Sequence, residues 1–165
     1  MRTRRPSRLR SFDYVGLHHY SLTYCTDRRR KWFADAETVA LVWAQFLRVA
    51  ERERFEILVY CFMPDHVHMV VKGCAEDSNG KDFIIKSKQC SAHAYAKAFN
   101  ARLWQPFAYE RVVRADEDVH RLARYILENP VRAGLAKTVL DYPFVGSQVY
   151  DVRALLDGLV VGKYA

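Results

Sequence analysis

The sequence predicts an α+β protein in which strands and helices follow in the order β-α-β-β-α-β, with one further helix near the end. Two patterns along the chain support this prediction. Long segments carry apolar residues at helical spacing, and shorter segments rich in β-branched and aromatic residues lie between them. The composition agrees, because half of the residues are hydrophobic and 27% are charged, which is typical of a globular chain.

The first half of the chain contains a predicted strand, a helix and a pair of strands. Residues 18–26 alternate and are rich in β-branched and aromatic residues, which predicts the first strand. Residues 36–54 place their apolar side chains on one face of a predicted helix. The segment EILVYCFMPDHVHMVVK, residues 56–72, reads as an apolar strand, a Met-Pro-Asp turn and a second strand.

The second half contains a helix, a strand and the additional helix. Residues 81–102 carry an apolar stripe that predicts a long helix, and residues 107–114 predict a fourth strand. A third helix is expected to start at residue 118, with Asp116 as its cap. It should end at the Asn129-Pro130 step, because the residue before a proline resists the helical conformation.

This order of elements is that of the ferredoxin-like, split βαβ arrangement. It predicts an antiparallel sheet with two helices on one face and the other face open. The additional C-terminal helix carries a tyrosine, Tyr125. The fold alone implies no chemistry, so function has to be argued from particular residues.

We expect residues 1–165 to form one domain, with a basic arm over residues 1–13 and a C-terminal extension over about residues 148–165. No apolar run approaches the roughly 18 residues of a membrane span, and no secretory signal follows the N-terminal arginines. The four cysteines form no CxxC pair. We therefore expect reduced thiols and a cytoplasmic protein with no membrane partner.

The positive charge of the chain is concentrated at its N-terminal end. The formal net charge is +7, and residues 1–31 hold nine basic residues against two acidic ones. The rest of the chain is balanced, so the excess forms one basic region that suits a nucleic-acid backbone or an anionic membrane surface. The arm has no amphipathic apolar face, which favours nucleic acid, although a solvated basic tail has the same composition.

Two histidines stand one residue apart in the second strand of the hairpin segment. His66 and His68 should share one face of that strand, while Val67 and Met69 face the opposite way, toward a core. Such a pair can be two ordinary polar residues of a half-buried strand, or it can bind one divalent ion. Its surroundings must decide between these alternatives.

The third predicted helix offers two further polar groups. On a helical wheel, Tyr125 and Asn129 are neighbours on the shoulder of the apolar stripe. Each has an ordinary alternative, as a packing tyrosine and as the cap of the next helical turn. Taken with the two histidines, they predict a three-ligand site for Mg²⁺ or Mn²⁺ and a phenol that can form a covalent phosphodiester.

Five stretches make the chain resemble a known family. They are MPDHVHMVV at residues 63–71, LWQ at 103–105, YERVVR at 109–114, ARYILENPVRAGL at 123–135 and YPFVGS at 142–147. The first resembles the HUH motif of the single-tyrosine transposases of IS200-like insertion sequences, where U is Val67 here. The others narrow the resemblance to the REP-associated tyrosine transposases, and it covers most of the chain.

The resemblance implies a role for each site residue. His66, His68 and Asn129 would bind a divalent metal, Mg²⁺ or Mn²⁺. Tyr125 would attack a DNA phosphate and give a 5′-phosphotyrosine and a free 3′-hydroxyl. The implied partner is single-stranded or hairpin (REP-like) DNA, cut beside a tetranucleotide at the foot of the hairpin. Some members dimerise, so a monomer and a homodimer are both open.

Several basic and aromatic side chains are candidates for DNA contacts. A cation near Tyr125 could hold a phosphate, and Trp104 and Tyr109 could stack on bases or belong to the core. Asp65 stands where the family commonly has asparagine, and it is either a turn residue or a partner for a ligand histidine. The candidates for DNA binding are Arg4, Arg5, Arg28, Arg29, Arg30, Trp104, Arg111, Arg114, Arg121 and Arg132.

The predicted function is that of a metal-dependent transposase, a single-strand DNA endonuclease that cuts and rejoins hairpin DNA through Tyr125. Two alternatives use the same fold. One is a non-catalytic protein that binds hairpin or single-stranded nucleic acid. The other is a phosphodiesterase in which water, rather than tyrosine, attacks the phosphate.

Overall fold

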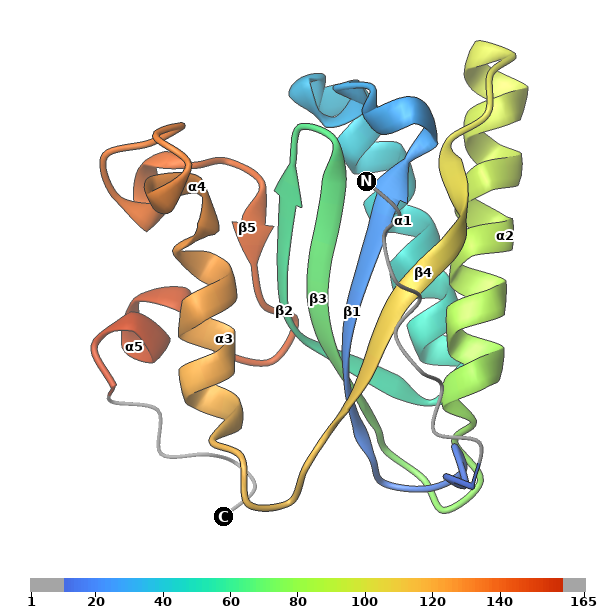
Figure 1. Ribbon diagram of the computed structural model, residues 1–165, viewed down its shortest axis with the longest axis vertical. Coiled ribbons are helices and arrows are strands. Elements are labelled where there is room, and N and C mark those ends of the chain that lie inside the picture. The colour runs from blue at the N-terminus through green and yellow to red at the C-terminus, as the bar shows by residue number, and fades with distance from the viewer. Residues whose placement is uncertain (1–10, 159–165) are drawn as a thin grey trace.

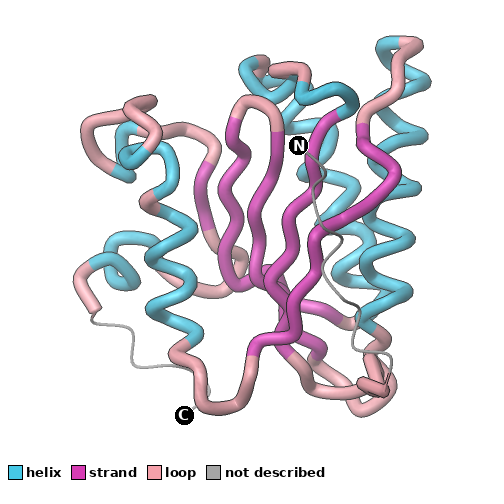
Figure 2. Tube along the Cα trace, viewed as in Figure 1, coloured by secondary structure: helices cyan, strands magenta, loops and turns pink. Residues whose placement is uncertain are grey.

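The computed structural model describes residues 11–158, which form an antiparallel sheet with helices on both faces (Figure 1). The five strands lie in the order β4-β1-β3-β2-β5 (Figure 2). The strands are β1 (His19–Thr26), β2 (Phe55–Met63), β3 (His66–Gly73), β4 (Trp104–Val113) and β5 (Val145–Gly146). The α-helices are α1 (Ala36–Glu53), α2 (Gly80–Phe99), α3 (Val119–Leu127), α4 (Asn129–Arg132) and α5 (Val152–Leu156).

The first four strands confirm the predicted ferredoxin-like arrangement. β1 lies between β3 and β4, and β2 pairs with β3 across the short hairpin turn. β5 is an addition that the sequence does not predict, and its two residues pair with Tyr60 and Cys61 of β2. A strand of two residues leaves no periodic pattern, so only its place beside β2 reveals it.

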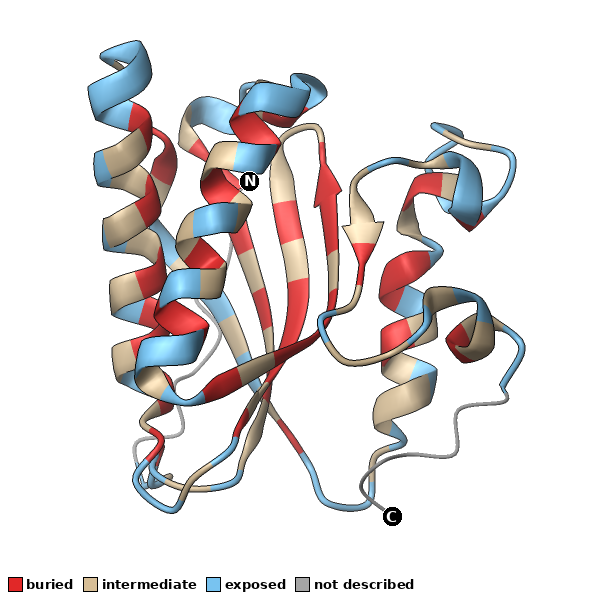
Figure 3. Ribbon diagram, turned by 180° about the vertical axis from the view of Figure 1, so that it is seen from behind, coloured by how far each residue is buried: buried red, intermediate tan, exposed pale blue. Residues whose placement is uncertain are grey.

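α1 and α2 together cover one face of the sheet, as predicted (Figure 3). Alternate strand residues, among them Leu22, Phe62 and Met69, are fully buried on this side. Asp35 caps α1, because its carboxylate accepts a hydrogen bond from the backbone N–H of Thr38 at 2.9 Å. This core supports β1 and β3 from behind the predicted site.

The opposite face is only half open, which differs from the prediction. α3, α4 and α5 pack beside β2, where a second core includes Cys61 and Val70 from the sheet and Ala123, Ile126 and Leu127 from α3. β2 carries apolar residues on both of its faces, so the second face also needs a cover. β1 and the beginning of β4 lie away from these helices, and the end of β4 leads into the loop before α3 (Figure 1).

The predicted second long helix runs three residues too far, because α2 ends at Phe99 rather than at residue 102, and two further boundaries are wrong. Asp118, not Asp116, caps α3, because its carboxylate accepts a hydrogen bond from the backbone N–H of Arg121 at 3.1 Å. β4 begins at Trp104 rather than at residue 107, and it tolerates Pro106 because it is an edge strand. These corrections shift an element slightly and leave the predicted order intact.

Residues 1–10, which include Arg4 and Arg5, lie outside the described part of the chain, as do residues 159–165. The described part of the predicted C-terminal extension contains α5, which packs on α3. Within residues 11–158, no helix is both long enough and apolar enough to cross a membrane.

Candidate active site

The β2–β3 hairpin places the two histidines on the face of the sheet that α3 partly covers. In the hairpin register, Cys61 of β2 lies opposite His68. Cys61 belongs to the core beneath α3, so His68 and His66 face that side. Val67 and Met69 point the other way and are fully buried against α1 and α2, which confirms the predicted alternation.

The two imidazole rings converge. Their Nε2 atoms lie 3.0 Å apart, and each Nδ1 atom faces an oxygen. The Asp65 carboxylate lies 2.6 Å from Nδ1 of His66, so when this nitrogen donates to it the neutral ring keeps a lone pair on Nε2. The Thr23 hydroxyl, 2.8 Å from Nδ1 of His68, can donate or accept. When His68 donates to Thr23, both Nε2 lone pairs point into the same space.

This geometry fits a divalent ion. Neighbouring ligands of an octahedral ion with bonds of about 2.1 Å lie roughly 3 Å apart, which is the separation of the two Nε2 atoms. Among the residues that the structure describes, no group of three His, Cys, Asp or Glu side chains could hold an ion. A complete site therefore needs at least one ligand besides the two imidazole nitrogens. The amide oxygen of Asn129 remains the predicted third ligand.

Burial keeps His68 neutral. Its ring has a pKa lowered from 6.5 to about 4, mainly by burial, with the charges of His66, Arg29 and Arg132 acting in the same direction. The neutral imidazole is the form that binds metals, so this ligand stays available well below neutral pH. The two arginines come from separate segments, and both lie within electrostatic reach of the ring.

Asp65 is held in turn by Arg29 from the loop after β1. The Nε atom of Arg29 lies 3.0 Å from the Asp65 carboxylate, and its Nη1 atom donates to Sγ of Cys25 at 2.7 Å. Arg28 and Arg29 have φ values of 53° and 55°, a left-handed conformation that is strained for residues other than glycine. This strained turn brings a candidate DNA-binding arginine to the histidines, and Asp65 is a partner of His66 rather than a plain turn residue.

Tyr125 lies on the exposed shoulder of α3, as the helical wheel predicts. It is 59% exposed, whereas its neighbours Ala123 and Ile126 are buried toward the sheet. Asn129 opens α4 just after α3 ends, because Pro130 is accepted in the first turn of a helix but not in its interior. The phenol and the amide therefore project from the same helical junction.

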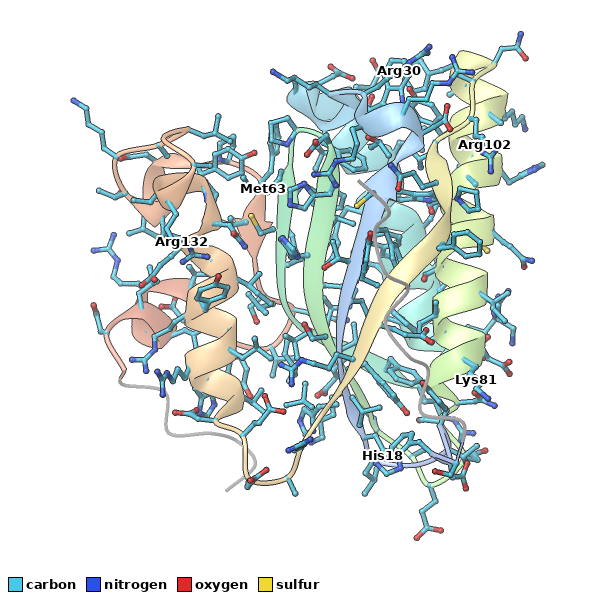
Figure 4. All side chains as sticks on the ribbon, viewed as in Figure 1. His18, Arg30, Met63, Lys81, Arg102 and Arg132 are labelled. Atoms are coloured by element: carbon cyan, nitrogen blue, oxygen red, sulfur yellow. The ribbon has the colours of Figure 1, made fainter. Side chains whose placement is uncertain are left out.

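Arg132 joins the tyrosine to the asparagine. Its Nη2 atom donates to the backbone carbonyl of Tyr125 at 2.6 Å and to Oδ1 of Asn129 at 3.1 Å. Its guanidinium lies over the phenol ring, 3.9 Å from the centroid (Figure 4 labels this arginine). Burial raises the pKa of Cys61 to about 12, and the charge of Arg132 opposes that rise. The positive charge of Arg132 also lowers the pKa of His68. The junction of α3 and α4, which carries Arg132, therefore lies within electrostatic range of the histidine face.

The remaining candidate arginines lie at opposite ends of the sheet. Arg28 and Arg30 follow β1, at the end where His66 begins β3, and Figure 4 labels Arg30 there. β4 is antiparallel to β1, so the end of β4 is the far end of the sheet. The candidates toward that end are Arg111, Arg114 and Arg121. Of these, only Arg28 and Arg30 lie at the end of the sheet where His66 begins β3.

Trp104 is not available for a DNA contact, so that prediction is wrong. It is 4% exposed, its indole N–H donates to the Ser91 hydroxyl at 2.9 Å, and its ring packs on Tyr24. The segment Leu103-Trp104-Gln105 is too short for its sequence to show whether the indole faces the core or the solvent. Packing under α2 places the indole in the core. Phe107 and Tyr109, farther along β4, are 59% and 37% exposed.

Comparison with known proteins assigns the family. The family model described as "Transposase IS200 like" matches residues 14–129, which span the hairpin and α3 and end at Asn129. The chain belongs to the IS200-like transposase family. Membership confirms the resemblance carried by the sequence motifs and identifies a DNA-processing enzyme.

Individual relatives of this IS200-like transposase agree. A REP-associated tyrosine transposase of Escherichia coli K12 is 29% identical over 98 residues, 59% of this chain and 58% of that protein. A Haemophilus influenzae protein, provisionally given the same name, is 26% identical over 156 residues, 88% of this chain and 86% of that protein. A solved REP-associated tyrosine transposase bound to a REP hairpin has a TM-score of 0.71 at 22% identity, over 94% of this chain and 88% of that one. This last likeness shows a shared fold.

Proposed function

We propose that this IS200-like transposase binds hairpin DNA and cuts and rejoins single strands through Tyr125. His66, His68 and Asn129 would hold the divalent metal, Mg²⁺ or Mn²⁺. The observation that carries the proposal is the convergence of the two Nε2 atoms, 3.0 Å apart, on a sheet face bordered by the helix of Tyr125. The solved relative is named as bound to a REP hairpin, which supports hairpin DNA as the substrate class.

Tyr125 would act as the nucleophile. Its phenol loses a proton, and the oxygen attacks the scissile phosphorus while the bond from phosphorus to the 3′-oxygen breaks. The 3′-oxygen takes a proton, which leaves a free hydroxyl and a 5′-phosphotyrosine. Arg132 holds the tyrosine backbone and lies over its ring, so it orients the phenol. The metal, when bound, neutralises charge that develops on the phosphate oxygens.

Rejoining follows from the same chemistry. The phosphotyrosine keeps the energy of the phosphodiester, so a 3′-hydroxyl can attack it and release the phenol. During both steps the Asp65 carboxylate would keep the proton of His66 on Nδ1, and the Thr23 hydroxyl would accept the corresponding proton of His68. With these contacts both Nε2 lone pairs would be free to bind the metal.

Basic side chains would hold the DNA backbone. Each phosphate contact adds affinity that falls as the salt concentration rises. We propose one domain over residues 1–165, acting as a monomer or a homodimer. The side chains proposed to contact DNA are Arg4, Arg5, Arg28, Arg29, Arg30, Arg111, Arg114, Arg121 and Arg132.

Tyr125→Phe tests the proposal, because it removes only an exposed hydroxyl. The wild type, incubated with a hairpin that carries a single-stranded extension and with Mg²⁺ or Mn²⁺, should form a DNA adduct that survives denaturing electrophoresis. Tyr125→Phe should abolish the adduct and keep hairpin affinity within about twofold. Tyr109→Phe, which changes another exposed tyrosine, is the matched control and should keep the adduct.

Other outcomes would favour the alternatives. Cleavage by Tyr125→Phe without an adduct would support attack by water. Hairpin binding by the wild type without cleavage, with either metal, would support a non-catalytic DNA-binding protein. An adduct formed by Tyr125→Phe would refute Tyr125 as the nucleophile.

A further inference from the structure

The histidine face of the sheet continues onto β1 and β4, beyond the main contacts of α3. Those contacts are with β2 and β3, whereas β1 and β4 follow at the other edge of the sheet, and Figure 2 shows the beginning of β4 far from α3. Leu22 and Tyr24 of β1 are buried against α1 and α2, so the residues that alternate with them face the opposite way. The side chains on this part of the face include Ser21, Thr23, Phe107, Tyr109 and Arg111.

The strand register connects this surface to the histidines. Thr23 lies opposite His68 on one side and opposite Tyr109 on the other. Neighbouring strands are about 4.8 Å apart, so Tyr109 lies about 10 Å from His68 along one row across the sheet. Phe107 precedes Tyr109 by two residues, so it lies on the same face of β4.

Both aromatic side chains are exposed, Phe107 at 59% and Tyr109 at 37%. Ala108 between them packs against the core under α1 and α2, so β4 turns a small residue inward and two large rings outward. Rings exposed to this degree at alternate strand positions offer flat apolar surface on which a base can stack.

We propose that Phe107 and Tyr109 form a stacking surface for unpaired bases of the DNA strand that leads to the metal site, an inference that rests on the proposed function. Every nucleobase has a flat face, so stacking on aromatic side chains stabilises a single strand whatever its sequence. The four-stranded sheets of RNA-recognition domains bind bases in this manner on an open face. Arg111, the next residue on this face, is held by Glu117 at 2.6 Å and can meet a phosphate of the same strand.

A protein strand is a poorer occupant of this edge. Pro106 has no backbone N–H, so it interrupts the hydrogen-bond ladder that an added strand would need. The side chains around the aromatic pair, Ser21, Thr23 and Arg111, are polar or basic. They suit a sugar-phosphate strand better than the apolar centre of a protein interface.

The test compares two DNAs by fluorescence anisotropy, in a Tyr125→Phe background without metal so that no strand is cut. One DNA is the hairpin alone, and the other carries an unpaired extension at its foot. Phe107→Leu and Tyr109→Leu should each weaken binding of the extended hairpin about five- to a hundredfold and leave the hairpin alone unchanged. Tyr109→Phe should keep the affinity, since the ring remains.

Phe99→Leu is the matched control, because Phe99 is a 40% exposed aromatic residue on α2, behind the sheet. It should bind both DNAs as the parent does. Abasic nucleotides in the extension should weaken binding by the parent and remove the effect of the two leucine variants. Unchanged binding of the extended hairpin by both variants, or an equal loss on the two DNAs, would overturn the inference. Neither result depends on adduct formation, which tests Tyr125 separately.

Discussion

Replacing Asp65 with alanine should weaken metal binding and leave the protein folded. The carboxylate accepts the Nδ1 proton of His66 at 2.6 Å and so keeps the Nε2 lone pair directed at His68. Without this acceptor the ring can carry its proton on Nε2, the atom that must bind the ion. Losing such an outer hydrogen bond typically costs about 10- to 100-fold in metal affinity, or about 1.4 to 2.7 kcal/mol. The side chains of His66 and Asp65 are only 17% and 26% exposed, which favours the upper part of that range.

Mn²⁺ is a suitable probe, followed by calorimetry and by the loss of the free-ion EPR signal. Asp65→Asn keeps an acceptor oxygen and should lose less affinity than Asp65→Ala. Arg29→Ala removes the ion pair at 3.0 Å that holds the carboxylate and should give an intermediate loss. Arg28→Ala, in the same turn, is the control and should bind Mn²⁺ as the wild type does. Wild-type affinity in folded Asp65→Ala protein would refute the reasoning.

Three further predictions concern stability and the tyrosine. Trp104→Ala should lower the free energy of unfolding in urea by about 3 to 5 kcal/mol, because a 4% exposed ring leaves the core. The folded fraction of this variant should still bind hairpin DNA, and a specific loss of binding would contradict the burial argument. In EDTA, which removes any metal, His68 of the unfolded chain takes up a proton near pH 6.5, whereas His68 of the folded chain does so only near its pKa of about 4. The free energy of unfolding should therefore fall as the pH drops between these two values. The free energy of unfolding, measured by urea titration, should fall by at most about 3 kcal/mol over this range. If His68→Gln shows the same dependence of this free energy on pH, His68 is not the group responsible. Arg132→Met should slow adduct formation about tenfold or more at saturating DNA, with partial rescue by Arg132→Lys, which keeps the charge but not the planar fork over Tyr125. An effect confined to DNA affinity would instead assign Arg132 to binding alone.

Local patterns are sufficient for the order of the elements and for the direction of the site side chains. The alternation around Val67 places His66 and His68 on one face, because a strand has a period of two whatever packs against it. The helical wheel places Tyr125 on an exposed shoulder of α3 for the same kind of reason. Caps and short elements are less predictable, since several acidic residues precede α3 and packing selects Asp118 among them.

Tertiary packing decides which side chains meet. Thr23 reaches His68 across a sequence separation of 45 residues, and Arg29 reaches Asp65 from the loop after β1. The periodicity of a single segment does not determine the register between strands that are distant in sequence. It also does not determine whether Trp104 faces the core or the solvent. The sequence by itself determines where each site residue points from its own element, because that depends on backbone period alone. The tertiary structure decides the partner, because that depends on which elements the hydrophobic core brings side by side.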